Sequence, residues 1–280
     1  MNTDFYLERG RDHAVCEDFA AAGVVNGCGY ALVSDGCSSS TEVDFGARIL
    51  VHAAREHLKP ALTVGEPFAA SAFARATITQ AGRVLGCFAA LPASTLDATL
   101  LLALVRPGER AGHFRAQVCF WGDGAVVVRQ NGRVRATLLR FAGNAPAYLS
   151  YTLDGPRRWA YLDRGGGGKE LQRVVLELSG GVVGREVREE PAADLLAPYR
   201  EEFALAAGDS LALVSDGITQ FFAADNTPIP WETLAPKLVD YKRPTGVFLR
   251  RRMNFFEREN RASGIRHLDD VSVAAVTLCP

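Results

Sequence analysis

Two identical strings in this chain each end in an acidic residue and a glycine. Ala31–Gly36 and Ala212–Gly217 both consist of Ala-Leu-Val-Ser-Asp-Gly. The apolar run predicts a buried strand, and Asp-Gly predicts its abrupt end, because glycine tolerates backbone angles closed to other residues. Hard oxygen ligands suit magnesium, manganese or calcium, so the carboxylates at two distant strand ends could be halves of one metal site.

Acidic residues also stand at three further predicted strand boundaries. They are Asp123, the pair Asp269-Asp270 and the pair Glu17-Asp18. For any one of these, the alternative explanation is that strand ends are solvated and therefore tolerate charge. The repetition at five boundaries favours the metal site.

The composition limits the class of protein. With 280 residues, 48% of them apolar, we expect one domain spanning residues 1–280. The net charge of −1 suggests no nucleic-acid partner, and the six cysteines include no Cys-x-x-Cys pair, which fits a reducing cytoplasm. The N-terminus has early charges and no apolar core of signal-peptide length, and the aliphatic run Ala98–Val105 is far shorter than the about 20 residues that span a bilayer, so we expect no membrane partner.

Regular elements must position these carboxylates. The pattern predicts strand, turn, strand, turn and strand over residues 1–36, and later a hairpin at Asn131-Gly132. The other predicted elements are helices at Val43–Lys59 (stopped by Pro60), Pro67–Cys87, Trp231–Tyr241 and Thr245–Arg261, and strands at Thr95–Val105, Phe114–Trp121, Ala125–Gln130, Val134–Phe141, Ser210–Ser215 and Val271–Val276. A variable, irregular segment is expected at about residues 143–199. This order suggests an α+β sandwich, although hydrophobic patterning alone does not separate it from other layouts.

Other catalytic motifs are incomplete or absent from the sequence. Gly165–Gly168 is followed by Lys169, but Glu170 replaces the Ser or Thr that a phosphate-binding loop needs, so a flexible loop is the better interpretation. Neither His-Glu-x-x-His nor Gly-x-Ser-x-Gly occurs, and no cysteine has an arginine six positions later, as a cysteine-based phosphatase would require.

The ordered acidic strand ends resemble the metal-dependent protein serine/threonine phosphatases of type 2C, the PPM family. The resembling segments span nearly the whole chain: Gly10–Asp18, Ala31–Gly36 with Asp44–Ala47, Leu96–Thr99, Gly122–Gly124, Leu211–Gly217 and Leu268–Val273. Each segment is short, but six of them in the family's order are specific. The resemblance implies a four-layer α-β-β-α sandwich, with two antiparallel sheets flanked by helices, that hydrolyses phosphoserine and phosphothreonine.

The resemblance also implies a set of metal ligands. Asp35 would bridge two ions of manganese or magnesium, the Gly36 carbonyl would complete one site, and Asp216 and Asp269 would bind the other. Two such cations lower the pKa of a shared water, orient it for in-line attack on phosphorus and neutralise the phosphoryl oxygens.

Three further acidic residues receive roles from the same resemblance. Glu17 and Asp18 would hold the water ligands of the metals. Asp123 would bind the additional, third metal of bacterial members.

Two departures from the family pattern affect the predicted site. His13 stands where many members have a phosphate-binding arginine, so phosphate would meet a titratable group, or nearby Arg9 or Arg11. Cys37 stands where animal enzymes have a histidine, which leaves protonation of the leaving group to metal-bound water or to His13. His13 could equally be a structural hydrogen-bonding residue. These changes resemble a divergent bacterial branch.

Three functions remain open on the sequence. An active phosphatase would act on a phosphorylated protein and oppose a serine/threonine kinase. The missing arginine at His13 motivates the alternative of a catalytically silent PPM-like regulatory module that binds a phosphoprotein partner. The third is a phosphatase for a small phosphomonoester.

Overall fold

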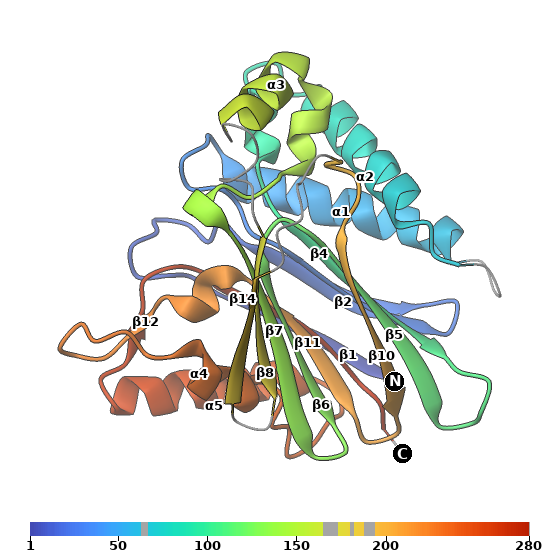
Figure 1. Cartoon of the computed structure of the whole chain (residues 1–280), viewed down its shortest axis with the longest axis vertical. Coiled ribbons are helices and arrows are strands. Elements are labelled where there is room, and N and C mark those ends of the chain that lie inside the picture. The colour runs from blue at the N-terminus through green and yellow to red at the C-terminus, as the bar shows by residue number, and fades with distance from the viewer. Residues whose placement is uncertain (63–66, 165–172, 180–181, 188–193, 280) are drawn as a thin grey trace.

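Two antiparallel sheets form the centre of the protein (Figure 1). The computed structural model describes residues 1–62, 67–164, 173–179, 182–187 and 194–279. The larger sheet contains, in spatial order, β1 (Asn2–Glu8), β14 (Val271–Thr277), β11 (Ser210–Val214), β6 (Gly124–Gln130), β7 (Arg133–Phe141), β8 (Arg173–Ser179) and β9 (Val182–Val187). The smaller sheet contains β10 (Tyr199–Ala206), β5 (His113–Trp121), β4 (Leu100–Pro107), β3 (Cys28–Ser34) and β2 (Phe19–Val25).

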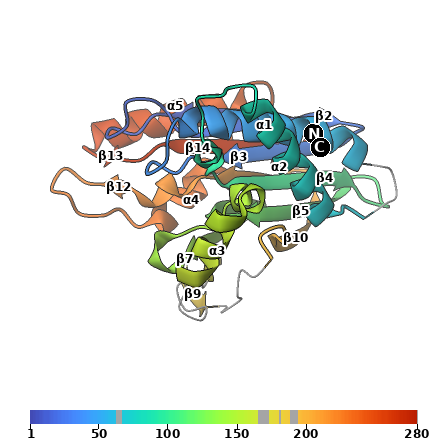
Figure 2. The same cartoon turned by 90° about the horizontal axis from the view of Figure 1, so that it is seen from above.

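Helices cover the outer face of each sheet, which makes four layers (Figures 1 and 2). On the smaller sheet lie α1 (Val43–Ala61) and α2 (Ala70–Leu85), and on the larger sheet α4 (Trp231–Leu238) and α5 (Phe248–Ala262). A further helix, α3 (Gly155–Arg164), lies at the apex of the view in Figure 1, and the short strands β12 (Phe221–Phe222) and β13 (Arg266–His267) pair beside α4 and α5. The predicted α+β class, with its α-β-β-α layers, is confirmed.

Alternate residues of the central strands supply three layers of core, because successive side chains of a strand point to opposite faces. From β4, Leu100, Leu102 and Leu104 pack with the helices α1 and α2. The intervening Leu101, Ala103 and Val105 pack between the two sheets, with residues of β6, β11 and β14. The other faces of β6, β11 and β14 pack against α4 and α5.

Most predicted elements agree with the structure within a few residues, and the Asn131-Gly132 hairpin between β6 and β7 is confirmed. Both residues have positive φ, 50° and 75°, as a tight two-residue hairpin turn requires. Within the described residues, no helix combines the length and apolar character needed to cross a bilayer.

Three expectations differ from the structure. The strand predicted to begin at Thr95 begins at Leu100, after a 3₁₀ helix at Ala93–Leu96, because the backbone between them bonds to the loop that follows β3. Pro60 does not follow α1 as a stop but lies inside it, one residue before the helix ends at Ala61, so the missing N–H removes only one backbone hydrogen bond near the helix end. The described parts of the segment at residues 143–199 contain α3, β8 and β9, whereas Gly165–Gly168 lies outside the described residues.

Gly46 provides a test of how α1 is seated. A Cβ at this position would lie 1.6 Å from the carbonyl oxygen of Thr95, so the helix touches the backbone directly. Gly46→Ala is expected to destabilise the protein by about 1–3 kcal/mol or more, because neither helix nor backbone can move aside. Gly86→Ala is the control, since its Cβ would meet nothing closer than 3.4 Å. Equal urea-unfolding midpoints for the two variants would contradict this packing.

Candidate functional site

The backbone on both sides of Asp35 is fixed by neighbouring strands. The Asp35 N–H donates to Thr99 Oγ1 over 3.0 Å, and the Thr99 N–H donates to the Asp35 carbonyl over 2.8 Å. The next residue, Gly36, forms an antiparallel bridge with Ala98. A Cβ on Gly36 would lie 2.8 Å from the Glu17 carbonyl oxygen, so a residue without a side chain is needed. Asp35 is therefore held at a defined place at the end of β3.

Asp216 has the equivalent place at the end of β11. It begins a short 3₁₀ helix, Asp216–Thr219. A Cβ on the adjacent Gly217 would lie 1.8 Å from the carbonyl oxygen of Asp270, so this turn lies directly against the residues that precede β14. The close approach brings Asp216 beside Asp269.

Asp123 lies in the turn between β5 and β6, between two glycines with positive φ. Gly122 has φ 105° and Gly124 has φ 132°. Side chains at these positions would also collide, because each Cβ would lie 2.7 Å from a methyl group, of Thr99 or Leu101. The Gly-Asp-Gly sequence is thus a requirement of this turn.

Five predicted aspartates form one electrostatic cluster. They are Asp18, Asp35, Asp123, Asp216 and Asp269. Burial raises the pKa of Asp18 to about 7 and that of Asp269 to about 6, and the charges of neighbouring aspartates add to both effects. Burial and nearby carboxylates also raise the pKa values of Asp35 and Asp123 well above the ordinary range, and the charge of Asp216 acts on both. A nearby cation would stabilise the ionised form of these carboxyl groups.

The donor atoms fit a hard divalent cation. Glu17 Oε2 and Asp18 Oδ2 are buried and lack a hydrogen-bond partner among the described residues. Buried polar atoms are usually satisfied, so such atoms beside a carboxylate cluster suggest a ligand shell. Oxygen-only donor sets of this kind suit magnesium or manganese.

Asp270 connects the predicted site residues, although the sequence analysis assigned a role only to its neighbour Asp269. It is 1% exposed. Its two carboxylate oxygens accept the N–H groups of Gly10 and Glu17, each over 2.6 Å, and one also lies 2.9 Å from His13 Nδ1. The adjacent acidic pair was the only sequence signal for this residue.

His13 faces carboxylates with both ring nitrogens. Its Nε2 lies 3.6 Å from Asp269 Oδ1, on the side opposite the Asp270 contact. Burial lowers the pKa of His13, but the Asp270 contact and the charges of Asp270, Asp269 and Glu17 outweigh burial and raise it. His13 is thus placed with the acidic residues that the sequence predicted for the site.

A second buried carboxylate, Asp97, was missed as an individual residue. Its oxygens accept hydrogen bonds from Ser40 Oγ (2.9 Å), Ser150 Oγ (2.5 Å) and Arg157 Nη2 (2.7 and 2.5 Å). Its carbonyl accepts the Cys37 N–H over 2.8 Å. Asp97 therefore joins α3 to the loop that carries Asp35 and Gly36, and no local sequence pattern reveals contacts of this range.

Tyr148 also reaches the site from the segment predicted to be irregular. It is 7% exposed, and burial together with the nearby Cys37 raises its pKa. The charges of Asp123 and Asp35 act on it as well, which places its hydroxyl group beside the acidic cluster.

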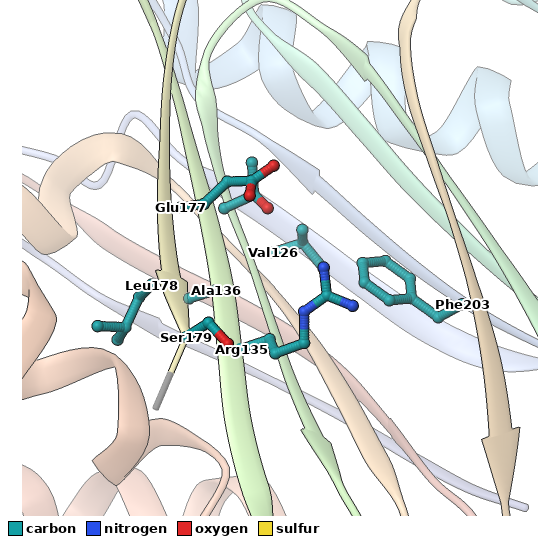
Figure 3. Close-up of a pocket in the computed structure, with 8 residues that line it drawn as sticks. Val126, Arg135, Ala136, Glu177, Leu178, Ser179 and Phe203 are labelled. Atoms are coloured by element: carbon teal, nitrogen blue, oxygen red, sulfur yellow. The ribbon is translucent and has the colours of Figure 1, made fainter. Parts of the chain in front are cut away.

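A pocket between β7, β8 and β10 lies apart from this cluster (Figure 3). Its wall includes Arg135, whose guanidinium group lies 6.0 Å from the centre of the Phe203 ring, and Glu177. Among the described residues that line it, none belongs to the predicted site. The carboxylate cluster is the better candidate for chemistry.

Comparison with known proteins gives a family and a set of similar structures. The sequence matches the family model of protein phosphatase 2C over residues 8–262. A search of curated protein sequences gives no match.

Several of the similar structures are those of protein phosphatases. The catalytic domain of the serine/threonine protein phosphatase PstP, in complex with two manganese ions, has a TM-score of 0.56 and 16% identity, covering 100% of this chain and 98% of that one. PstP/Ppp of Mycobacterium tuberculosis has a TM-score of 0.54 and 15% identity, covering 100% and 99%. The PP2C domain of SpoIIE from Bacillus subtilis, with a fragment of its regulatory domain, has a TM-score of 0.54 and 13% identity, covering 99% and 63%. At such identities the likeness concerns the fold.

The raised pKa values predict how metal and pH act together on stability. In the metal-free protein, Asp18 and Asp269 keep protons that the unfolded chain releases near pH 4, so their contribution to stability is lost as pH rises to about 7. Manganese competes with those protons, so its stabilisation is expected to grow from about pH 5.5 to 7.5 and to reach about 2.7 kcal/mol at 100 times its Kd. Calorimetric unfolding with manganese or chelator measures this, with Asp216→Asn as the variant that weakens the effect. A pH-independent manganese effect would contradict the cluster.

The Arg157–Asp97 contact predicts that replacing Arg157 lowers the free energy of unfolding. Arg157→Met leaves the carboxylate of Asp97, which is 5% exposed, without its cation. Breaking a buried pair costs about 3–5 kcal/mol, and because Arg157 is itself 27% exposed we expect about 1–3 kcal/mol here. Thermal unfolding would measure the loss against Arg158→Met, whose side chain is exposed. Equal stability of the two variants would mean that the contact does not hold α3.

Proposed function

Because this chain belongs to the protein phosphatase 2C family, we propose that it is a metal-dependent phosphatase that hydrolyses phosphoserine and phosphothreonine in proteins. Two divalent cations, manganese or magnesium, would supply an activated water nucleophile and neutralise charge on the phosphoryl oxygens. The substrates would be proteins phosphorylated by an opposing serine/threonine kinase.

One observation carries this proposal: the two repeated strand ends bring Asp35 and Asp216 into one group of carboxylates. Burial and the charges of Asp18 and Asp216 raise the pKa of Asp35 well above its ordinary range. With Asp269 beside them, these residues would hold the two ions, together with the carbonyl of Gly36. The buried Asp123, at the end of β5, would hold an additional ion.

Glu17 and Asp18 would orient water at the same site. Each has a buried carboxylate oxygen that no described residue hydrogen-bonds, and such an oxygen can accept a hydrogen bond from water. The hydrogen bond from the Glu17 N–H to Asp270 fixes the backbone at this point, so both side chains are positioned by the residues that precede β14.

His13 has two proposed roles, contact with the substrate phosphate and structural hydrogen bonding, and its contacts favour one of them. Both of its ring nitrogens face acidic groups, Asp269 and Asp270, which favours a role in orienting Asp269 over direct contact with phosphate. The side chain of Arg9 donates to the His13 carbonyl. Arg11 is exposed, and its backbone N–H donates to the His267 carbonyl. We therefore favour Arg11 as the cation that would meet the substrate phosphate.

The test is release of phosphate from a phosphothreonine peptide, with manganese, magnesium or chelator. Asp35→Asn and Asp216→Asn are each expected to lower kcat/KM by more than the about 10- to 100-fold typical of losing an outer partner of a metal ligand. Asp240→Asn is the control, because Asp240 is 65% exposed and pairs with Arg129. Turnover that survives chelation, or is unaffected by Asp216→Asn, would contradict the metal assignment.

The alternative class of function has a distinct outcome in the same experiment. A catalytically silent regulatory module would bind manganese, and a phosphoprotein, without turnover of any peptide. A phosphatase for small phosphomonoesters would hydrolyse p-nitrophenyl phosphate and leave phosphopeptides intact.

A further inference from the structure

Three side chains from separate elements, none of them a member of the carboxylate cluster described above, lie close together. Glu8 ends β1, Glu257 lies on α5 and His267 lies on β13. One ligand atom from each lies within 4.8 Å of the others, and among the described residues this is the one group of three or more acidic, histidine or cysteine side chains so closely spaced. Among the described residues, no three of the carboxylates proposed for catalysis come this close together.

Glu257 is a buried acid with one carboxylate oxygen that the described residues leave without a hydrogen bond. Its side chain is 7% exposed, and the oxygen without a hydrogen-bond partner among the residues that the structure describes is Oε1. Leaving a buried carboxylate oxygen unsatisfied is costly, and no arginine or lysine is within ion-pair distance of Glu257 in the described structure. An additional positive group beside Oε1 would remove that cost.

The ring of His267 has the orientation found in metal-binding histidines. Its Nδ1 lies 2.8 Å from the carbonyl oxygen of Asp269, and a carbonyl can only accept, so Nδ1 carries a hydrogen. Nε2 then faces the acids, 3.8 Å from Glu257 Oε2. A backbone carbonyl on the far nitrogen is the usual way in which proteins orient a histidine ligand. The Phe221 ring, 5.2 Å away between centroids, restricts further rotation.

The spacing also suits an ion better than a direct bond. The 3.8 Å between His267 Nε2 and Glu257 Oε2 exceeds hydrogen-bond length. Two ligands at about 2.1 Å from a tetrahedral zinc ion lie about 3.4 Å apart, close to this separation. Glu8 is held in place by the hydroxyl group of Tyr6 and by Arg261, whose Nη2 is 3.4 Å from Oε1.

We propose that Glu8, Glu257 and His267 bind a divalent transition-metal cation of the zinc class, at a site separate from the catalytic one. One imidazole nitrogen with two carboxylate oxygens suits zinc, with water completing the tetrahedron. The ion would join β1, α5 and the segment that leads to Asp269. It would therefore stabilise the folded chain, and this proposal does not depend on the catalytic function.

The experiment counts zinc in full-length protein whose catalytic ligands are disabled by Asp35→Asn and Asp216→Asn. After equilibration with zinc and gel filtration, elemental analysis is expected to find about one zinc per chain. Adding Glu257→Gln should lower zinc affinity at least about 10-fold, measured by competition with a chromophoric chelator. Glu259→Gln on the same helix is the matched control, because Glu259 is 46% exposed and pairs with Arg252.

A second variant and a spectroscopic measurement cover the case in which Glu257→Gln does not fold, as judged by circular dichroism. Glu8→Gln should reduce zinc affinity in the same way. X-ray absorption of the one-zinc protein should show scattering from a single imidazole. Unchanged zinc affinity in the glutamine variants, no zinc retention, or a spectrum without imidazole would overturn the proposal and leave His267 and Glu257 as an ion pair.

Discussion

Repulsion among buried and half-buried carboxyl groups is the interaction that the rest of this structure must resist. Burial and mutual charge raise the pKa values of Asp18, Asp35, Asp123 and Asp269, so in the metal-free protein these groups hold protons more tightly than usual. Such a cluster persists only where its surroundings leave it no room to relax. The surroundings here are backbone: glycine positions bring one strand end directly against the carbonyl groups of another, so the carboxylates cannot separate without moving whole strands.

The two sheets provide that rigidity because their cores interlock. Leucine and valine side chains from both sheets fill the space between them, while the opposite faces of the same strands pack against helices. A one-residue slip of any central strand would turn its apolar set to the wrong layer, so the register is strongly specified. The register therefore also fixes where each strand ends and where the acidic residue at that end lies.

Two peripheral polar clusters attach the outer elements to these strand ends. The carboxylate of Asp97 accepts a hydrogen bond from Arg157 of α3. Its carbonyl accepts the N–H of Cys37, which lies two residues after Asp35. His267, between Glu8 and Glu257, contacts the Asp269 carbonyl. Each cluster therefore supports the backbone beside one proposed metal ligand, Asp35 or Asp269, and each does so with side chains from elements far apart in the chain.

The sequence by itself determined which strand ends carry carboxylates, because the repeated Ala-Leu-Val-Ser-Asp-Gly string encodes buried strand and abrupt turn through local preferences alone. The same local signals identified the Asn131-Gly132 hairpin, and the ordered motifs indicated the layered fold. Only the tertiary structure decided that Asp270 connects Gly10, Glu17 and His13, that Asp97 meets Arg157, and that Glu257 faces His267. These contacts join residues that are 10 to more than 250 positions apart, and a side chain's neighbours at such distances depend on how sheets and helices pack, which no local pattern contains.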